Sequence, residues 1–243
     1  MSPAADVVAL PASRVTRRPR RLFFVALPVL MGLAVFIGFA PSYYLKGAFG
    51  TPSLTGLYHV HGLLFTSWML LMIAQPLLVM TRRTDLHRRI GSIAALLIVA
   101  MVIAACFVAV DGGRRGAAPP GIPPLAFMLV PMATVVVFPA LTGAALFWRN
   151  TPQTHKRLML IATMELIPAG FGRWTLLASS GPLGFFGTTD LFLVAMLIYD
   201  KVTTRRFHPA TIYGGAFLIA SQVARVALSG TATWQSLAAW LIA

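Results

Sequence analysis

Charged residues are scarce in this sequence. Of its 243 residues, 20 are Lys or Arg and only 6 are Asp or Glu, whereas 58% are apolar. Soluble domains contain about 25% charged residues; this chain contains 11% and has a mean hydropathy of +0.79. This composition excludes a disordered chain, a nucleic-acid-binding domain and an ordinary soluble enzyme. The net charge of +14 is read instead as a topology signal, because basic residues mark the cytoplasmic side of membrane proteins.

Cysteine and lysine are also nearly absent. The single cysteine, Cys106, lies in an apolar run, so no internal disulfide can form and a small packing residue is expected. The only lysines are Lys46, Lys156 and Lys201, all in predicted connections. A rhodopsin needs a lysine within its last helix to bind retinal, so that class is excluded. The sequence has no nucleotide-binding motif, which argues against an ATP-driven pump.

Long apolar runs recur along the chain, and each is long enough to cross a bilayer as a helix. We predict an all-α integral membrane protein, a seven-transmembrane-helix bundle, in three parts: a basic tail (1–21), a membrane domain (22–229) and a short interfacial segment (230–243). The N-terminus lacks the pattern of a cleavable signal peptide. The predicted spans are 22–40, 57–80, 91–110, 125–148, 158–178, 186–200 and 211–229.

Basic residues are distributed unevenly between the two sides of the predicted bundle. Segment 14–21 and connections 81–90, 149–157 and 201–210 hold 15 of them, whereas the opposite connections hold three. This bias predicts a cytoplasmic N-terminus and, with seven spans, a periplasmic C-terminus in a bacterial inner membrane. The opposite connections are rich in Pro and Gly, which is typical of turns.

Three histidines lie among the basic residues of the predicted cytoplasmic side: His87, His155 and His208. The first two occupy similar positions, 68 residues apart, which indicates a weak repeat of helical hairpins. The simplest interpretation places all three in the headgroup layer. The alternative is that they converge as metal or haem ligands, since three histidines suit zinc, although neighbouring Arg and Lys disfavour a bare cation.

Ionisable side chains inside spans are costly and therefore mark candidate sites. Arg173, Asp190 and Arg225 are predicted at similar depth near the periplasmic side. A short connection, 179–185, makes two spans neighbours, so we expect Arg173 and Asp190 to form an ion pair. Arg225 would then be free to bind an anionic or amphiphilic ligand. The alternative is a structural pair with a snorkelling Arg225 and no ligand.

Other polar and aromatic residues can line such a pocket. Span 57–80 places His61 and Trp68 on one stripe, with His59 on another, and Tyr44 ends the preceding span. Glu165 lies near mid-membrane beside a proline, where it is either protonated and hydrogen-bonded or a proton-relay or ligand-binding group. Asp200 is expected to be a headgroup-level anchor at the cytoplasmic end of its span.

Three motifs carry a family resemblance: YHVHG at 58–62, LHRRIG at 86–91 and THKRLM at 154–159. The sequence resembles a family of uncharacterised bacterial multi-span membrane proteins, which implies no activity. It is also distantly similar to predicted membrane proteins of the cytochrome b561 type, in which histidines from two helices hold each haem at one depth. His59 or His61 matches the outer position, with no second histidine at that depth. His87 and His155 form the only matched inner pair, expected in loops.

The sequence therefore predicts a membrane protein with an outward-facing polar pocket for an anionic amphiphile, a quinone or a haem. The candidate ligand-binding residues are His61, Arg173, Asp190, Arg225, Trp68, Tyr44, His59 and Glu165. Two other functions stay open: a non-catalytic accessory subunit of a larger membrane complex, and an electron-transfer protein with haem b. No catalytic residue is assigned, and the lipid bilayer is the one firm partner.

Overall fold

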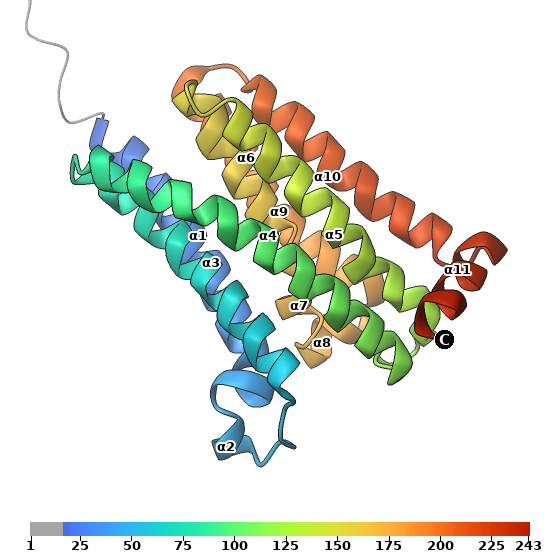
Figure 1. Cartoon of the computed structure of the whole chain (residues 1–243). Helices are drawn as coiled ribbons and strands as arrows, with labels where there is room; N and C mark the ends of the chain where they lie inside the picture. Colours follow the sequence, from blue (N-terminus) through green and yellow to red (C-terminus); the bar gives the residue numbers. More distant parts are fainter. Residues whose placement is uncertain (1–16) are drawn as a thin grey trace, which may run out of the picture.

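The computed structural model describes residues 17–243, so most of the predicted basic tail lies outside the described part. All regular elements in this part are helical (Figure 1). In chain order they are α1 (Arg17–Phe39), the π-helical turn η2 (Ala40–Tyr44), α2 (Lys46–Phe49), α3 (Gly56–Met80), α4 (Thr84–Arg114), α5 (Pro124–Phe147), α6 (Pro152–Met164), α7 (Pro168–Phe171), α8 (Thr175–Ser179), α9 (Gly181–Thr204), α10 (Pro209–Leu228) and α11 (Ala232–Ile242).

Six helical segments of the described part are long and apolar enough to cross a membrane. They are Leu22–Tyr44, Gly56–Met80, Thr84–Arg114, Pro124–Phe147, Gly181–Thr204 and Pro209–Leu228. Large apolar side chains cover their outer faces; for example, Leu96 is 72% exposed and Phe147 is 77% exposed. Such surfaces are stable against lipid rather than water. The prediction of a multi-pass all-α membrane protein is confirmed.

The predicted span 158–178 is not a continuous helix. α6 ends at Met164, and the short helices α7 and α8 follow it. Pro168 accounts for the break, because proline has no backbone N–H and its ring clashes with the carbonyl four residues earlier, here that of Met164. The chain still passes from one end of the bundle to the other through α6, α7 and α8 (Figure 1).

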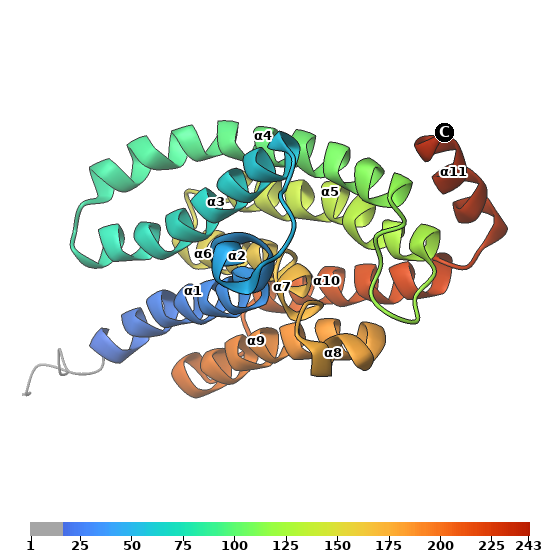
Figure 2. The same ribbon diagram turned by 90° about the horizontal axis from the view of Figure 1, so that it is seen from below.

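The bundle has two chemically different ends. The basic end is formed by the connections around 81–83, 148–151 and 205–208, and it carries arginines on each of them. The far end is formed by the connections before α5, α9 and α11, together with α11 itself, which packs on α4 and α5 (Figure 2). α1 begins at the basic end and the chain terminates at the far end, as Figure 1 shows.

A close backbone contact holds the broken segment against α1. A Cβ atom on Gly38 would overlap the carbonyl of Gly170 in α7, and one on Gly170 would lie 3.0 Å from the Cα of Val35. Small residues allow this approach, as they do between membrane helices generally. The contact therefore fixes the position of α7 and, through it, of the break at Glu165.

This contact predicts that Gly38→Ala destabilises the protein by about 1–3 kcal/mol, the usual cost of overpacking. Gly143→Ala is the matched control, because no atom lies within 4 Å of a Cβ at that helical position and alanine favours helix by about 1 kcal/mol. Thermal unfolding in detergent should show a lower midpoint for Gly38→Ala alone. Equal midpoints for the two variants would contradict the close contact.

Candidate functional site

A saturated polar network surrounds Asp200 at the basic end. Its carboxylate accepts from Arg157 Nε at 3.1 Å, from Thr211 Oγ1 at 2.6 Å and from the His208 backbone N–H at 3.1 Å. Arg157 also donates from Nη1 to the carbonyl and side-chain oxygens of Gln153, both at 2.9 Å. Asp200 and Arg157 are 0% and 2% exposed. The expectation of a headgroup-level anchor at Asp200 is wrong: the residue ties α6, α9 and α10 together.

His208 belongs to this network and not to a histidine cluster. Its Nδ1 accepts from the Ala210 backbone N–H at 3.1 Å and so caps the N-terminus of α10. Burial and the positive charge of Arg157 lower the pKa of His208, which favours the neutral, accepting form. Within residues 17–243 no group of three His, Cys, Asp or Glu side chains could hold a metal ion, so the three-histidine site is not formed.

A second buried ion pair joins Glu165 and Arg225. Arg225 Nη2 donates to Glu165 Oε1 at 2.6 Å and lies 3.3 Å from Ser221 Oγ, and Thr134 Oγ1 donates to the same carboxylate oxygen at 2.7 Å. Glu165 and Arg225 are each 3% exposed. The expectation of an unpaired Arg225 is therefore wrong. The missed signal was Glu165 itself, the mid-membrane acid at the point where the helix breaks.

This second pair is incompletely satisfied. Glu165 Oε2 and Arg225 Nε are both buried and have no hydrogen-bond partner among the described residues. More than about nine in ten buried polar groups form a hydrogen bond, so two atoms of one ion pair without a hydrogen-bond partner mark this pair as a candidate binding site. One is an acceptor and the other a donor.

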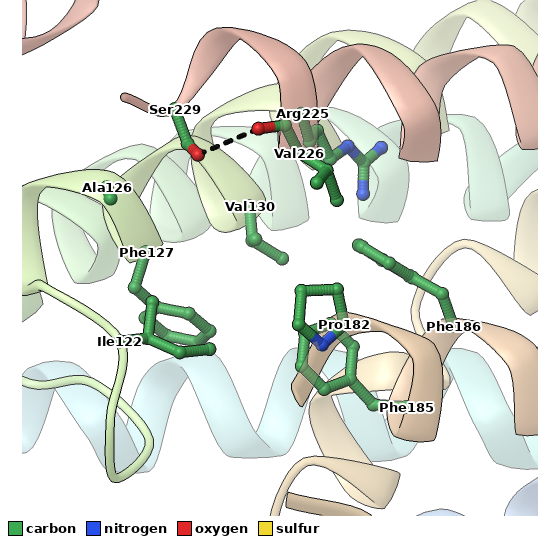
Figure 3. Close-up of a pocket in the computed structure, with 10 residues that line it drawn as sticks. All are labelled: Ile122, Ala126, Phe127, Val130, Pro182, Phe185, Phe186, Arg225, Val226 and Ser229. Atoms are coloured by element: carbon green, nitrogen blue, oxygen red, sulfur yellow. Dashed lines mark hydrogen bonds between the residues drawn. The ribbon is translucent and has the colours of Figure 1, made fainter. Parts of the chain in front are cut away.

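A pocket adjoins the Glu165–Arg225 pair between α5, α9 and α10 near the far end. Figure 3 shows its lining residues: Ile122, Ala126, Phe127, Val130, Pro182, Phe185, Phe186, Arg225, Val226 and Ser229. The space, including its open mouth, is about 300 Å³. Arg225 is the only charged residue in the lining, and its guanidinium lies 5.7 Å from the Phe186 ring centroid.

Arg173 and Asp190 do not form the expected pair. Asp190 accepts from Gln222 Nε2 at 2.9 Å, whereas Arg173 donates to the Ala169 carbonyl at 2.7 Å and lies 3.9 Å above the Phe39 ring. The expectation assumed one helix up to residue 178 and a direct turn. α8 intervenes instead, and Arg173 faces α1 before the chain reaches α9.

The four candidates from the N-terminal half do not line the pocket. Tyr44 hydrogen-bonds with Thr66 at 2.8 Å, Trp68 Nε1 donates to Thr163 at 3.2 Å, and His61 stacks on Phe65 at 4.1 Å between centroids. His59 is exposed at the start of α3. Of these four residues, only His61 has a buried, unbonded polar atom, Nδ1.

His87 and His155 come together at the basic end. Each is the fourth residue of its helix, α4 and α6, so the expectation that they lie in loops is wrong. Their ring centroids are 6.4 Å apart and the ring planes cross at 87°. His155 Nδ1 is bonded to the Ala145 carbonyl at 2.8 Å, which leaves its Nε2 available as a ligand.

Unsatisfied polar atoms surround this histidine pair. Both amide atoms of the Gln75 side chain are buried without a partner in the described part of the chain, and Gln75 Nε2 lies 3.9 Å from the position of a Cβ on Gly91, one helical turn after His87. His87 Nδ1 is likewise unbonded. The two histidines of α4 and α6 and the Gln75 amide of α3 are therefore candidate ligand-binding groups.

No protein-family model matches the chain, and no curated protein or solved structure matches it significantly. The arrangement of side chains alone thus bears on function.

The contrast between buried and exposed pairs gives a stability prediction. Asp200→Asn leaves the buried Arg157 without a negative partner and should lower the unfolding free energy by about 3–5 kcal/mol. The double change with Arg157→Gln should recover much of that loss, because neither charge is then stranded. Asp111→Asn is the control, since its pair with Arg115 is 40–56% exposed and such pairs contribute at most about 1 kcal/mol. Thermal unfolding in detergent measures all three variants; an Asp200→Asn loss no larger than that of Asp111→Asn would contradict the network.

Proposed function

We propose that this protein is a membrane electron-transfer protein that binds haem b between His87 and His155. The observation that carries the proposal is the separation of the two rings. A metal–nitrogen bond of about 2.0 Å plus ~1.1 Å from nitrogen to ring centre places two opposed imidazoles about 6.2 Å apart. The centroids of His87 and His155 are 6.4 Å apart.

The surroundings of both rings support this assignment. Histidine ligands generally donate their second ring N–H to a carbonyl, which fixes the ring and its tautomer. The Ala145 carbonyl is so placed for His155, and His87 Nδ1 is buried without a partner among the described residues. The unmatched amide of Gln75 supplies a further hydrogen-bonding group at the same site.

The basic residues beside the histidines also fit a haem better than a bare ion. Arg88 and Arg89 follow His87 and are exposed at the basic end. They would repel an isolated cation, but a haem brings two propionates, and arginine binds carboxylates well. Charge therefore favours a macrocycle with its own anionic groups over a zinc or copper ion.

Ligation by two histidines restricts the chemistry. A haem held by His87 and His155 would supply one-electron transfer and would leave no position for oxygen or substrate to bind. The chain's own role is to hold both imidazoles in fixed tautomers and to screen the site from water with apolar helices. No residue near the pair has the arrangement of a nucleophile and base.

The spectral test follows directly. The protein purified from haem-sufficient cells should show a Soret band and a sharp α band after reduction with dithionite. His87→Gln and His155→Gln should each lose these bands, whereas His59→Gln, at an exposed position, should keep them. A flat spectrum of the wild type, or full bands in both ligand variants, would overturn the proposal. Thermal unfolding of each variant checks that loss of haem is not loss of fold.

The proposed orientation places the basic end in the cytoplasm of a bacterium and the C-terminus in the periplasm. A C-terminal alkaline phosphatase fusion should therefore be active, and a C-terminal green fluorescent protein fusion should be dark. The opposite pattern would place the C-terminus in the cytoplasm and overturn the proposed orientation.

A further inference from the structure

The pocket between α5, α9 and α10 is far from the histidine pair along the bundle and is built differently. Nearly all its lining is apolar, and three phenylalanines contribute to it: Phe127, Phe185 and Phe186. The one charged lining residue is Arg225, which is bound to Glu165. We propose that this pocket binds the head of a quinone or quinol, a neutral membrane-soluble ring with carbonyl or hydroxyl groups.

Charge balance favours a neutral ligand. Arg225 is already neutralised by Glu165 through a 2.6 Å contact, and both side chains are 1–2% exposed. An anionic headgroup would add a negative charge that no described residue of the pocket lining compensates, and an uncompensated charge is costly in a site of low dielectric. The anionic ligand expected from an unpaired Arg225 thus loses its basis, whereas the amphiphilic character of the ligand is retained.

The unmatched atoms specify which neutral groups the ligand needs. Arg225 Nε is a donor without an acceptor, and Glu165 Oε2 is an acceptor without a donor. A quinone carbonyl accepts from a guanidinium, and a quinol hydroxyl donates to a carboxylate. Thr134, which holds the other carboxylate oxygen, lies one helical turn from the lining residue Val130. Arg225 connects the ion pair to the pocket, because it both lines the pocket and donates to Glu165.

The walls and the mouth suit the rest of such a molecule. Aromatic side chains stack on or edge against planar rings, and three of the lining residues are phenylalanines. Val226, which lines the pocket, is 52% exposed on the lipid-facing surface of α10. An apolar tail can therefore leave the pocket directly into the bilayer without crossing water.

The binding test uses decylubiquinone with the purified protein in detergent, measured by isothermal titration calorimetry. We expect saturable binding at one site per chain, and at least tenfold weaker binding of decanoate, an anion with a similar tail. Ala126→Phe should fill the pocket and weaken decylubiquinone binding at least tenfold. Ala140→Phe, an exposed position on the same helix, should bind like wild type.

A second pair of variants tests the pocket independently, in case the Ala126→Phe variant does not fold. Val226→Trp narrows the pocket mouth at a half-exposed position, and Val223→Trp places the same bulk on the lipid-facing surface of α10, where Val223 is 62% exposed. We expect weaker binding for Val226→Trp only. Absence of saturable binding, tighter binding of decanoate than of decylubiquinone, or wild-type binding by the pocket variants would each overturn the assignment. None of these outcomes depends on whether His87 and His155 hold haem.

Discussion

The polar interior of the bundle depends on the break in the helix at Glu165. Pro168 cannot continue the hydrogen bonding of α6, and Gly170 lets α7 pack directly on Gly38 of α1. The break leaves Glu165 at the end of α6, where it meets Thr134 of α5 and Arg225 of α10. Without that acid, Arg225 would be a buried, uncompensated cation inside the membrane, so the ion pair depends on the place where the helix breaks.

The state of hydrogen bonding separates the structural polar network from the groups proposed to bind ligands. Asp200 and Arg157 have their hydrogen bonds supplied by neighbouring residues, and such a saturated network locks helices without offering atoms to a ligand. Elsewhere the unbonded buried atoms gather chiefly beside the histidine pair and in the Glu165–Arg225 pair. Because an unmade buried hydrogen bond costs about 1–3 kcal/mol, a bound molecule that completes it gains that amount in return.

The sequence predicted the apolar spans and the importance of buried charges, but not how those charges pair. Pairing depends on helix rotation and on where helices end, and a one-helix interpretation of 158–178 placed Arg173 opposite Asp190. In the structure α8 lies between the two residues in the chain and they do not meet. The side chain of Gln222 donates a hydrogen bond to Asp190 instead. Pro152 carried a usable signal, because proline favours the first position of a helix. It placed His155 one turn inside a helix and not in a loop.

Acidic residues are so few that their positions constrain which ligands the interior can accept. Glu165 and Asp200 each neutralise one buried arginine, and Asp111 pairs with Arg115 at the far end. The nearest carboxylate in the sequence, Asp85, is exposed and forms no group of three possible metal ligands with the histidines in the described chain, and Arg88 and Arg89 add positive charge nearby. In the proposed assignments the ligand at the basic end carries its own negative groups, whereas the ligand beside the neutral Glu165–Arg225 pair carries none. The same scarcity of acids thus favours an anionic macrocycle at one site and an uncharged ring at the other.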